Sequence, residues 1–382
     1  MAAVFGITTL RPSSALNAVM LRSFAARPAE QLILRLVVFD DELSPSDRRL
    51  PGLAVLRRPA FLPYPHLQCT QKVLQWLVYA LHHFAHARWV GQLDSDSWFD
   101  PHRLLSYLGA LEARLPADAL VWAGLFEHWQ RLRTNGTLEC VGFSYDSPGA
   151  VVAWPERDPA RARLPEEARR RESFAMAQGG FYFFSRGAAA ELMRHVHRVR
   201  DATSADGLRV LSTPPAADGR QKKRQAGEYR PPPDPCDAIV GWLGARAFEG
   251  KALFAVGLHL NLEYHTFPVF TRYNPAHALL VHHVKAGPAL QRTVDFYEQR
   301  NRNATPPVTP RFTCVPTWWL HSRSRGWKLC YNTAPCGDGE TESAPLLLPR
   351  MVAGKPTNET APWFPVGVRT LCARARTARQ LA

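Results

Sequence analysis

Two carboxylates, Asp94 and Asp96, stand one residue apart at the end of an apolar run. The run over residues 89–93 has the composition of a strand that enters a core, and aromatic residues follow the acids. Alternate residues of an extended segment point the same way, so both carboxylates can face one cation. Their oxygens suit Mg²⁺ or Mn²⁺, and a cation held there can bridge the phosphates of a nucleotide. The alternative is an acidic turn that merely ends a strand.

The segments before and after these acids alternate between strands and helices. Apolar, β-branched runs predict strands at 4–10, 32–39 and 88–93, and helical spacing of apolar residues predicts helices at 15–26, 67–84 and 101–115. A strand, a helix and a strand of these lengths favour a parallel βαβ unit. In such an α/β sheet the carboxyl ends of the strands open into the crevice where ligands bind.

The remainder of the chain predicts more elements of both kinds. Strands are expected at 55–62, 119–126, 253–261 and 278–284, helices at 186–200 and 236–244, and an apolar segment with a Gly-Gly pair at 174–185. Residues 202–235 are rich in Pro, Gly and charge, which predicts a flexible basic insertion. We therefore expect one domain over residues 1–290. Residues 291–382, rich in Pro, Trp and Cys, are expected to form a C-terminal extension that is disulfide-tied or partly disordered.

The chain is strongly basic, with a net charge of +14 from 47 basic and 33 acidic residues. Such a balance suits nucleic acid, an anionic membrane surface, or an anionic substrate such as a sugar nucleotide. Arginine is spread along the chain and no nucleic-acid-binding motif occurs, so we expect no nucleic-acid partner. A solvated basic surface accounts for most of the excess. No apolar run reaches the roughly eighteen residues of a membrane span.

Cysteines and sequons indicate the compartment. Four of the seven cysteines follow residue 313, a spacing compatible with one or two disulfides in the tail: Cys314, Cys330, Cys336 and Cys372. Three Asn-x-Thr sequons occur, at Asn135, Asn303 and Asn358. Both features favour an oxidising, glycosylating lumen.

Four segments of this chain, taken in order, resemble the β1,3-glycosyltransferases of family 31, the galactosyltransferase and N-acetylglucosaminyltransferase group to which fringe-type enzymes are related. They are residues 64–72, residues 92–99 around the two acids, residues 179–186 and residues 236–241. The third segment, Gly-Gly-Phe-Tyr-Phe-Phe-Ser-Arg, closely repeats the family's Gly-Gly-x-Tyr-x-x-Ser-Arg. The resemblance covers about residues 3 to 290.

This resemblance implies a GT-A fold, in which a Rossmann-like nucleotide-binding half is merged with an acceptor-binding half. It implies a UDP-sugar donor, with galactose or N-acetylglucosamine as the sugar, and inverting transfer to a hydroxyl of a glycan or glycoprotein acceptor through a β1,3 linkage. It also implies a type II membrane protein of the Golgi lumen, whose N-terminal anchor is not in this chain.

The resemblance also implies a metal site. Mn²⁺, or Mg²⁺, would be held by Asp94, Asp96 and a late histidine, and Asp94 would help bind the donor. His283 is preferred to His282 because its His-x-Lys sequence suits the family's position better. Two neighbouring histidines remain as alternatives on sequence alone.

Asp237 matches the family's general base, which takes the proton of the acceptor hydroxyl. Gly179 and Gly180 match residues that let the backbone approach the donor sugar, since side chains there would collide with it. The alternative interpretation is that the Gly-Gly pair forms a tight turn between two secondary-structure elements. Three tryptophans are candidates for stacking on sugar faces, although most tryptophans are core: Trp98, Trp122 and Trp129.

Two departures from the family pattern favour a rival function. The middle acid of the family's triplet is Ser95 here, and the acid before Asp237 is Cys236. They suit a catalytically inactive, carbohydrate-binding relative with the same fold. A metal-dependent phosphodiesterase is a weaker rival, because such two-metal sites need more converging Asp and His than the sequence offers.

Overall fold

A computed structural model of the chain describes most of its central elements. No described helix is both long enough and apolar enough to cross a membrane. The described residues are 3–9, 11–25, 31–60, 62, 67–134, 137–143, 173–199, 236–258, 262–264, 279–282, 287–303, 312–316, 326–332, 347–352 and 355–362. The predicted insertion at 202–235 lies outside them.

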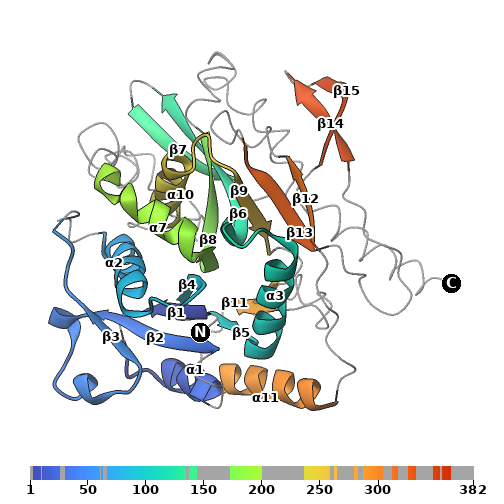
Figure 1. Ribbon diagram of the computed structural model, residues 1–382. Coiled ribbons are helices and arrows are strands. Elements are labelled where there is room, and N and C mark those ends of the chain that lie inside the picture. The colour runs from blue at the N-terminus through green and yellow to red at the C-terminus, as the bar shows by residue number, and fades with distance from the viewer. Residues whose placement is uncertain are drawn as a thin grey trace, which may run out of the picture.

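A ten-stranded sheet runs through the molecule in the order β12-β13-β9-β6-β8-β4-β1-β2-β3, with β7 paired to β6 (Figure 1). Its strands are β1 (Ala3–Thr8), β2 (Leu32–Phe39), β3 (Leu53–Leu56), β4 (Trp89–Asp94), β6 (Leu120–Thr134), β7 (Thr137–Phe143), β8 (Ser173–Ser185), β9 (Leu253–Gly257), β12 (Phe312–Pro316) and β13 (Lys328–Asn332). The first four are mutually parallel, β8 is antiparallel to β4 and β6, and β9 is parallel to β6 and β13.

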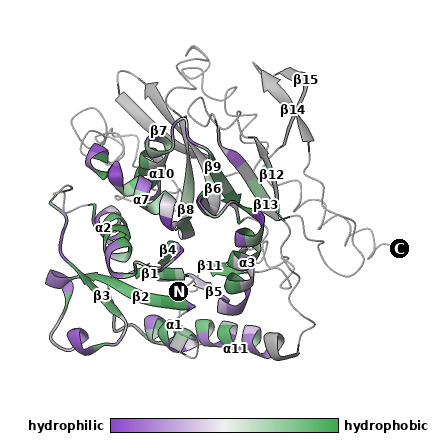
Figure 2. Cartoon of the chain, viewed as in Figure 1, coloured by the Kyte–Doolittle hydropathy of each residue, from purple (hydrophilic) through white to green (hydrophobic). Residues whose placement is uncertain are grey.

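Helices cover both faces of this sheet and give two cores (Figure 1). Helices α2 (Gln68–His83), α7 (Arg186–Arg194) and α10 (Cys236–Ala247) pack on one face. Helices α1 (Ala15–Ala25), α3 (Pro101–Arg114) and α11 (Gly287–Asn303) pack on the other. Successive strand residues alternate between the two cores, as Tyr182 and Phe183 do, so the central strands are apolar on both faces (Figure 2).

The α/β class predicted from the sequence is confirmed. The parallel βαβ start continues into a second, mixed half of the same sheet, which is the arrangement expected of the GT-A type. Helix α3 begins as predicted with Pro101, whose missing N–H costs nothing at the first turn. Asp100 caps this helix by accepting hydrogen bonds from the amides of His102 and Arg103 at 2.9 and 3.3 Å.

The third strand differs from the prediction. A strand was expected at 55–62, but β3 spans Leu53–Leu56. Pro59 has no N–H for a strand ladder, and the Arg58 guanidinium turns away to pair with Asp41 at 2.7 Å. The apolar run therefore leaves the sheet earlier than its composition indicates.

Elements beyond residue 300 continue the main sheet, although the sequence pattern there indicates none. Strand β13 pairs with β9, and β12 pairs with β13. One disulfide of the kind expected in the tail is present, since Cys314 is bonded to Cys330 across this strand pair. A separate hairpin joins β14 (Leu347–Val352) to β15 (Lys355–Pro362).

A second, three-stranded sheet lies at one edge of the first in the order β10-β11-β5. It consists of β5 (Trp98–Phe99), β10 (Leu262–Tyr264) and β11 (Leu280–His282). Strand β5 follows β4 after a short turn, so this sheet brings residues near 280 beside the two acids.

Two glycines allow close packing at the centre of the main sheet. A Cβ on Gly6 would lie 2.5 Å from the Trp76 ring, so the indole of α2 sits directly on strand β1. The Trp76 indole N–H donates to the carbonyl of Gly91 in β4 at 2.8 Å. On the opposite face, a Cβ on Gly91 would collide with the Phe5 ring. Trp76 therefore fixes α2 against both β1 and β4.

Glu191 ties α7 to the segment before β9. Its side chain is buried and accepts hydrogen bonds from Lys251 Nζ at 2.6 Å and from Arg194, with His195 Nε2 at 3.1 Å. Burial by itself would raise the pKa of Glu191, but the hydrogen bond and charge of Lys251, with His195 and Arg194, outweigh it and hold the pKa below its usual value.

Replacing Glu191 by Gln should therefore destabilise the protein in a pH-dependent way. We expect the free energy of unfolding at pH 7 to fall by about 1.5–3 kcal/mol, the range for hydrogen bonds to charged groups. A carboxyl whose folded pKa is lowered stabilises the fold above its unfolded pKa of about 4.3, and this contribution is lost as the pH falls through the lower folded value. The difference in the free energy of unfolding between wild type and variant should therefore become smaller at acid pH. The measurement is urea unfolding followed by tryptophan fluorescence.

The control is Asp118→Asn, which removes a carboxylate from an exposed position. Its unfolding curves should match those of the wild type from pH 7 to pH 3 within about 0.5 kcal/mol. If the difference in the free energy of unfolding between wild type and Glu191→Gln stayed constant over this pH range, the pKa of Glu191 would not be lowered in the folded protein.

Candidate functional site

The site lies where the strand order of the main sheet reverses. Strand β1 has β2 on one side and β4 on the other, and all three are parallel, so their carboxyl ends meet at one edge. Thr8 at the end of β1 is in register with Asp94 at the end of β4. In open α/β sheets this reversal point is where ligands bind.

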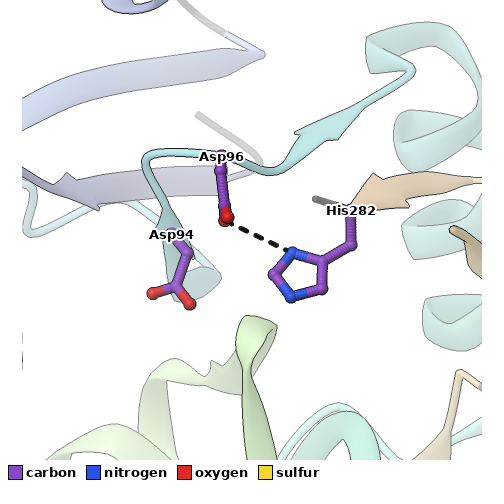
Figure 3. Close-up of side chains that lie close together, drawn as sticks. All are labelled: Asp94, Asp96 and His282. Carbon is purple, nitrogen blue, oxygen red and sulfur yellow. Dashed lines mark ion pairs between the residues drawn. The ribbon is translucent and has the colours of Figure 1, made fainter. Parts of the chain in front are cut away.

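Three metal-ligating side chains converge at this edge: Asp94, Asp96 and His282. One ligand atom from each can be chosen so that all lie within 4.8 Å of one another, and all three residues are half-buried. The Asp96 carboxylate lies 3.5 Å from Nδ1 of His282, drawn as the dashed line in Figure 3. Asp94 ends β4, Asp96 stands in the following turn, and His282 ends β11.

Backbone structure explains how these residues meet. The amide of Ser97 donates to the carbonyl of Asp94 at 3.0 Å, which closes the turn that carries Asp96. The chain then enters β5, where Trp98 pairs with Val281 of β11. The next residue of β11 is His282, so the strand pairing delivers it to the acids across more than 180 residues of sequence.

The donor set fits a divalent cation. Two carboxylates and one imidazole supply hard oxygens and a borderline nitrogen, which first-row divalent ions accept. The two carboxylates lie close together, and their negative charges favour the binding of a cation near them. Thus the residues present can hold such an ion at the ligand-binding edge of the sheet.

Gly180, in the interior of β8 and just before the part that pairs with β4, packs against His282. A Cβ on Gly180 would lie 3.1 Å from both Cε1 and Nδ1 of His282 and 3.2 Å from Cγ. Such distances are shorter than ordinary van der Waals contact, so the imidazole occupies the room that a side chain would need. The structure thereby gives this glycine a contact that sequence reasoning did not foresee.

Gly180→Ala should weaken metal binding while leaving the fold intact. The added methyl would push the imidazole a few tenths of an ångström from its place, and we expect the affinity for Mn²⁺ to fall about tenfold, as for other changes that misorient a ligand. The measurement is Mn²⁺ titration followed by electron paramagnetic resonance.

Gly109→Ala in α3 is the matched control, because a Cβ there would meet nothing within 4 Å. It should bind Mn²⁺ as the wild type does and unfold at slightly higher denaturant, since Ala favours a helix by up to about 1 kcal/mol over Gly. Wild-type affinity in Gly180→Ala would show that His282 does not depend on this contact.

A buried phenol links the acids to α10. Tyr182 of β8 is fully buried, and within the described part of the chain its hydroxyl has no hydrogen-bond partner. Burial raises the pKa of Tyr182 well above its usual value. The electrostatic influence of Cys236, Asp237, Cys69 and Asp94 raises this pKa further. Asp237 stands in the first turn of α10, and this helix packs on β8, the strand that pairs with β4.

A buried ion pair braces the same edge of the sheet. The ammonium of Lys72 in α2 donates to the carbonyl of Thr9 at 2.7 Å and pairs with Glu42 at 2.6 Å. Burial lowers the pKa of Lys72, and the Glu42 carboxylate opposes this effect. These contacts join the residue after β1 to the short helix η1 (Asp40–Glu42) that follows β2, and so hold α2 against the carboxyl ends of both strands.

The predicted site residues meet different outcomes. Asp94 and Asp96 lie together, and Asp237 stands in the first turn of α10. His283 lies outside the described residues, so the preference for it stays a prediction, while its neighbour His282 is the histidine that joins the acids. Gly179 belongs to β8, but its role toward a sugar stays a prediction.

The prediction that Trp98 and Trp122 stack on sugar faces is wrong. Trp98 is 2% exposed and Trp122 is 0% exposed, so both rings belong to the cores and no ligand can reach their faces. Nothing is described of the Trp129 side chain. Ser97, also buried beside His282, was missed because a serine in an acidic turn gives no signal of its own.

No protein-family model matches this chain, and neither does any curated protein sequence. Solved structures resemble it distantly. The galactosyltransferase LgtC, in complex with donor and acceptor sugar analogs, is 12% identical over 80% of this chain and 98% of its own, with a TM-score of 0.36. A glycosyltransferase involved in the glycosylation of the major capsid of PBCV-1 is 8% identical over 77% of this chain and 100% of its own, with a TM-score of 0.35.

The mannose-1-phosphate geranyltransferase of Thermus thermophilus is 18% identical over 54% of this chain, with a TM-score of 0.28. This chain spans 65% of that protein's length. At identities and scores this low, these likenesses assign no function to the chain.

Proposed function

We propose that this chain is an inverting, metal-dependent glycosyltransferase that moves a hexose from a UDP-sugar to a hydroxyl of a glycan or glycoprotein. The observation that carries the proposal is the cluster of Asp94, Asp96 and His282 at the reversal point of an α/β sheet. A cation site at this place suits a ligand with a diphosphate, because the phosphate oxygens complete the coordination.

The three clustered residues would hold Mn²⁺ or Mg²⁺. When bound, such an ion would neutralise the negative charge that develops on the diphosphate as UDP leaves. The imidazole in the donor set favours Mn²⁺ over Mg²⁺, which prefers oxygen ligands throughout. Gly179 and Gly180 would let the strand backbone lie close to the donor.

Asp237 is the general base in this proposal. The acceptor oxygen forms a bond to the anomeric carbon while the bond from that carbon to the UDP oxygen breaks, and UDP leaves with the electron pair. The acceptor proton passes to the carboxylate of Asp237. Attack from the face opposite UDP inverts the anomeric centre. The place of Asp237 in the first turn of α10, a helix that packs on the strand beside β4, supports this role.

The finer assignments rest on the family 31 resemblance. They are galactose or N-acetylglucosamine as the transferred sugar, a β1,3 linkage, and a place in the Golgi lumen behind an N-terminal anchor. The disulfide between Cys314 and Cys330 supports an oxidising compartment.

One observation favours a second candidate, a carbohydrate-binding relative that does not turn over. Cys236 stands where the family has an acid before the base, and its side chain is 4% exposed. A buried thiol cannot replace a carboxylate in the site, so Asp237 would act without that neighbour.

The test is a transfer assay on the purified chain with UDP-galactose and UDP-N-acetylglucosamine, with Mn²⁺ or with chelator, and a panel of glycan acceptors. Mn²⁺-dependent release of UDP, with an acceptor whose mass rises by one hexose or N-acetylhexosamine, would support transfer. Binding of UDP-sugar without release would select the carbohydrate-binding relative. Absence of any UDP-sugar binding would overturn the transferase proposal.

A further inference from the structure

Ser97 lies in the turn between the acids and β5, and its side chain is fully buried. Its hydroxyl oxygen is 2.5 Å from Nδ1 of His282. Strand β5 is antiparallel to β11, with Phe99 opposite Leu280 and Trp98 opposite Val281. Continuing this register places Ser97 opposite His282, so the backbone itself sets the contact.

A carboxylate also lies near the same nitrogen. The Asp96 carboxylate is 3.5 Å from Nδ1, beyond normal hydrogen-bond length, whereas the Ser97 hydroxyl, at 2.5 Å, is 1.0 Å closer to the same nitrogen. The ring is also confined by Gly180, whose Cβ position is 3.1 Å from Nδ1. Serine on one side and the glycine backbone on the other leave the imidazole little freedom to turn.

We propose that Ser97 is a positioning residue that selects the tautomer of His282. Its hydroxyl accepts the Nδ1–H, so the lone pair of the neutral ring is on Nε2, and Nε2 is the nitrogen offered to a divalent cation. Because the hydroxyl takes the Nδ1–H, Asp96 would serve as a ligand of the cation and not as the acceptor of this proton. The metal-binding half of this inference rests on the proposed function.

Figure 3 shows the geometry on which this depends. The contact to Asp96 is on Nδ1, and the second ring nitrogen, Nε2, is separated from it by one carbon, Cε1. Metal-bound histidines usually donate their second ring N–H to a neighbouring acceptor, and loss of that acceptor costs about 10- to 100-fold in metal affinity. Here a serine hydroxyl would fill the acceptor's place.

The decisive variants are Ser97→Ala, which removes the hydroxyl, and Ser97→Thr, which keeps it. The control is Ser23→Ala, because Ser23 is also buried and its hydroxyl accepts from the Trp98 indole at 3.1 Å. It thus removes a similar hydrogen bond from the neighbouring strand residue without touching His282.

The first readout needs no metal. Nitrogen-15 NMR of histidine-labelled, metal-free protein, at a pH where the ring is neutral, reports which nitrogen of His282 carries the proton, with His282→Gln used to assign the signal. We expect the Nδ1–H tautomer in the wild type, in Ser97→Thr and in Ser23→Ala, and a shift toward the Nε2–H tautomer in Ser97→Ala. An Nε2–H tautomer in the wild type, or no change in Ser97→Ala, would overturn the assignment.

The second readout is Mn²⁺ alone, by electron paramagnetic resonance titration and by the coupling of the bound ion to imidazole nitrogen. Ser97→Ala should bind about 10- to 100-fold more weakly, with the nitrogen coupling reduced, and Ser97→Thr should restore both. Unchanged affinity and coupling in Ser97→Ala would overturn the metal-binding half. A wild type that binds no Mn²⁺ would overturn the proposed function and that half together, while the tautomer result would still decide the role of Ser97.

Discussion

Asp96→Asn should abolish the Mn²⁺-dependent binding of UDP-sugars. The change keeps the shape of the side chain and removes one of the two negative charges that face His282. A neutral amide oxygen is a far weaker ligand than a carboxylate, and we expect the affinity for Mn²⁺ to fall at least about 100-fold, the upper range for changes next to a ligand. The measurement is calorimetric titration of UDP-galactose and UDP-N-acetylglucosamine with and without Mn²⁺.

Asp118→Asn is the control, since it removes the same charge from an exposed position near the start of β6. It should bind donor and metal as the wild type does. If Asp96→Asn kept wild-type, Mn²⁺-dependent affinity, the cluster would not be the donor's cation site. Residual binding that no longer responds to Mn²⁺ would show that the nucleotide has contacts of its own.

Asp237→Asn should stop transfer without stopping binding. The carboxylate is the proposed acceptor of the proton, and loss of a positioned general base lowers kcat by about 10²- to 10⁴-fold. The cation cluster is made by other residues and Asn keeps the size of the side chain, so the affinity for Mn²⁺ and UDP-sugar should change far less than kcat. Steady-state transfer kinetics and calorimetry on the same preparation separate the two effects.

Glu249→Gln is the matched control, because it neutralises an exposed carboxylate just after the end of α10. Its kcat should equal that of the wild type. A wild-type kcat in Asp237→Asn would remove Asp237 from the chemistry and leave the base to be sought elsewhere. Equal losses of kcat and donor affinity would point instead to collapse of the crevice.

Local sequence patterns predict the βαβ half of this fold well. The apolar runs that end at Asp40 and Asp94 are β2 and β4, and the amphipathic run between them is α2. The two acids are also predictable as a pair, because one intervening residue and a strand end suffice to bring them together. Such features depend on residues close in sequence.

Features that depend on distant pairing are not predictable in the same way. Whether His282 or His283 faces the acids depends on the register between β5 and β11, and a slip of one residue turns the opposite face of the strand toward the site. The sequence offers two adjacent histidines and no turn that fixes this register. The role of Ser97 cannot be predicted from the sequence for the same reason, because only the pairing of β5 with β11 places Ser97 opposite His282. Strands β12 and β13 were missed because their apolar runs are short and lie among Pro and Cys.

The glycine and tryptophan packing at the sheet centre has an evolutionary consequence. Because the Trp76 ring occupies the place of a Cβ on Gly6, neither position can change alone without a steric clash or a void. Helix α2 carries both Trp76 and Lys72. A lineage that loses the contact between Gly6 and Trp76 must therefore also reposition the Lys72 ammonium, which donates to the carbonyl of Thr9. Positions 6, 72 and 76 should therefore be inherited as a group, and drift at one of them marks a divergent ligand edge.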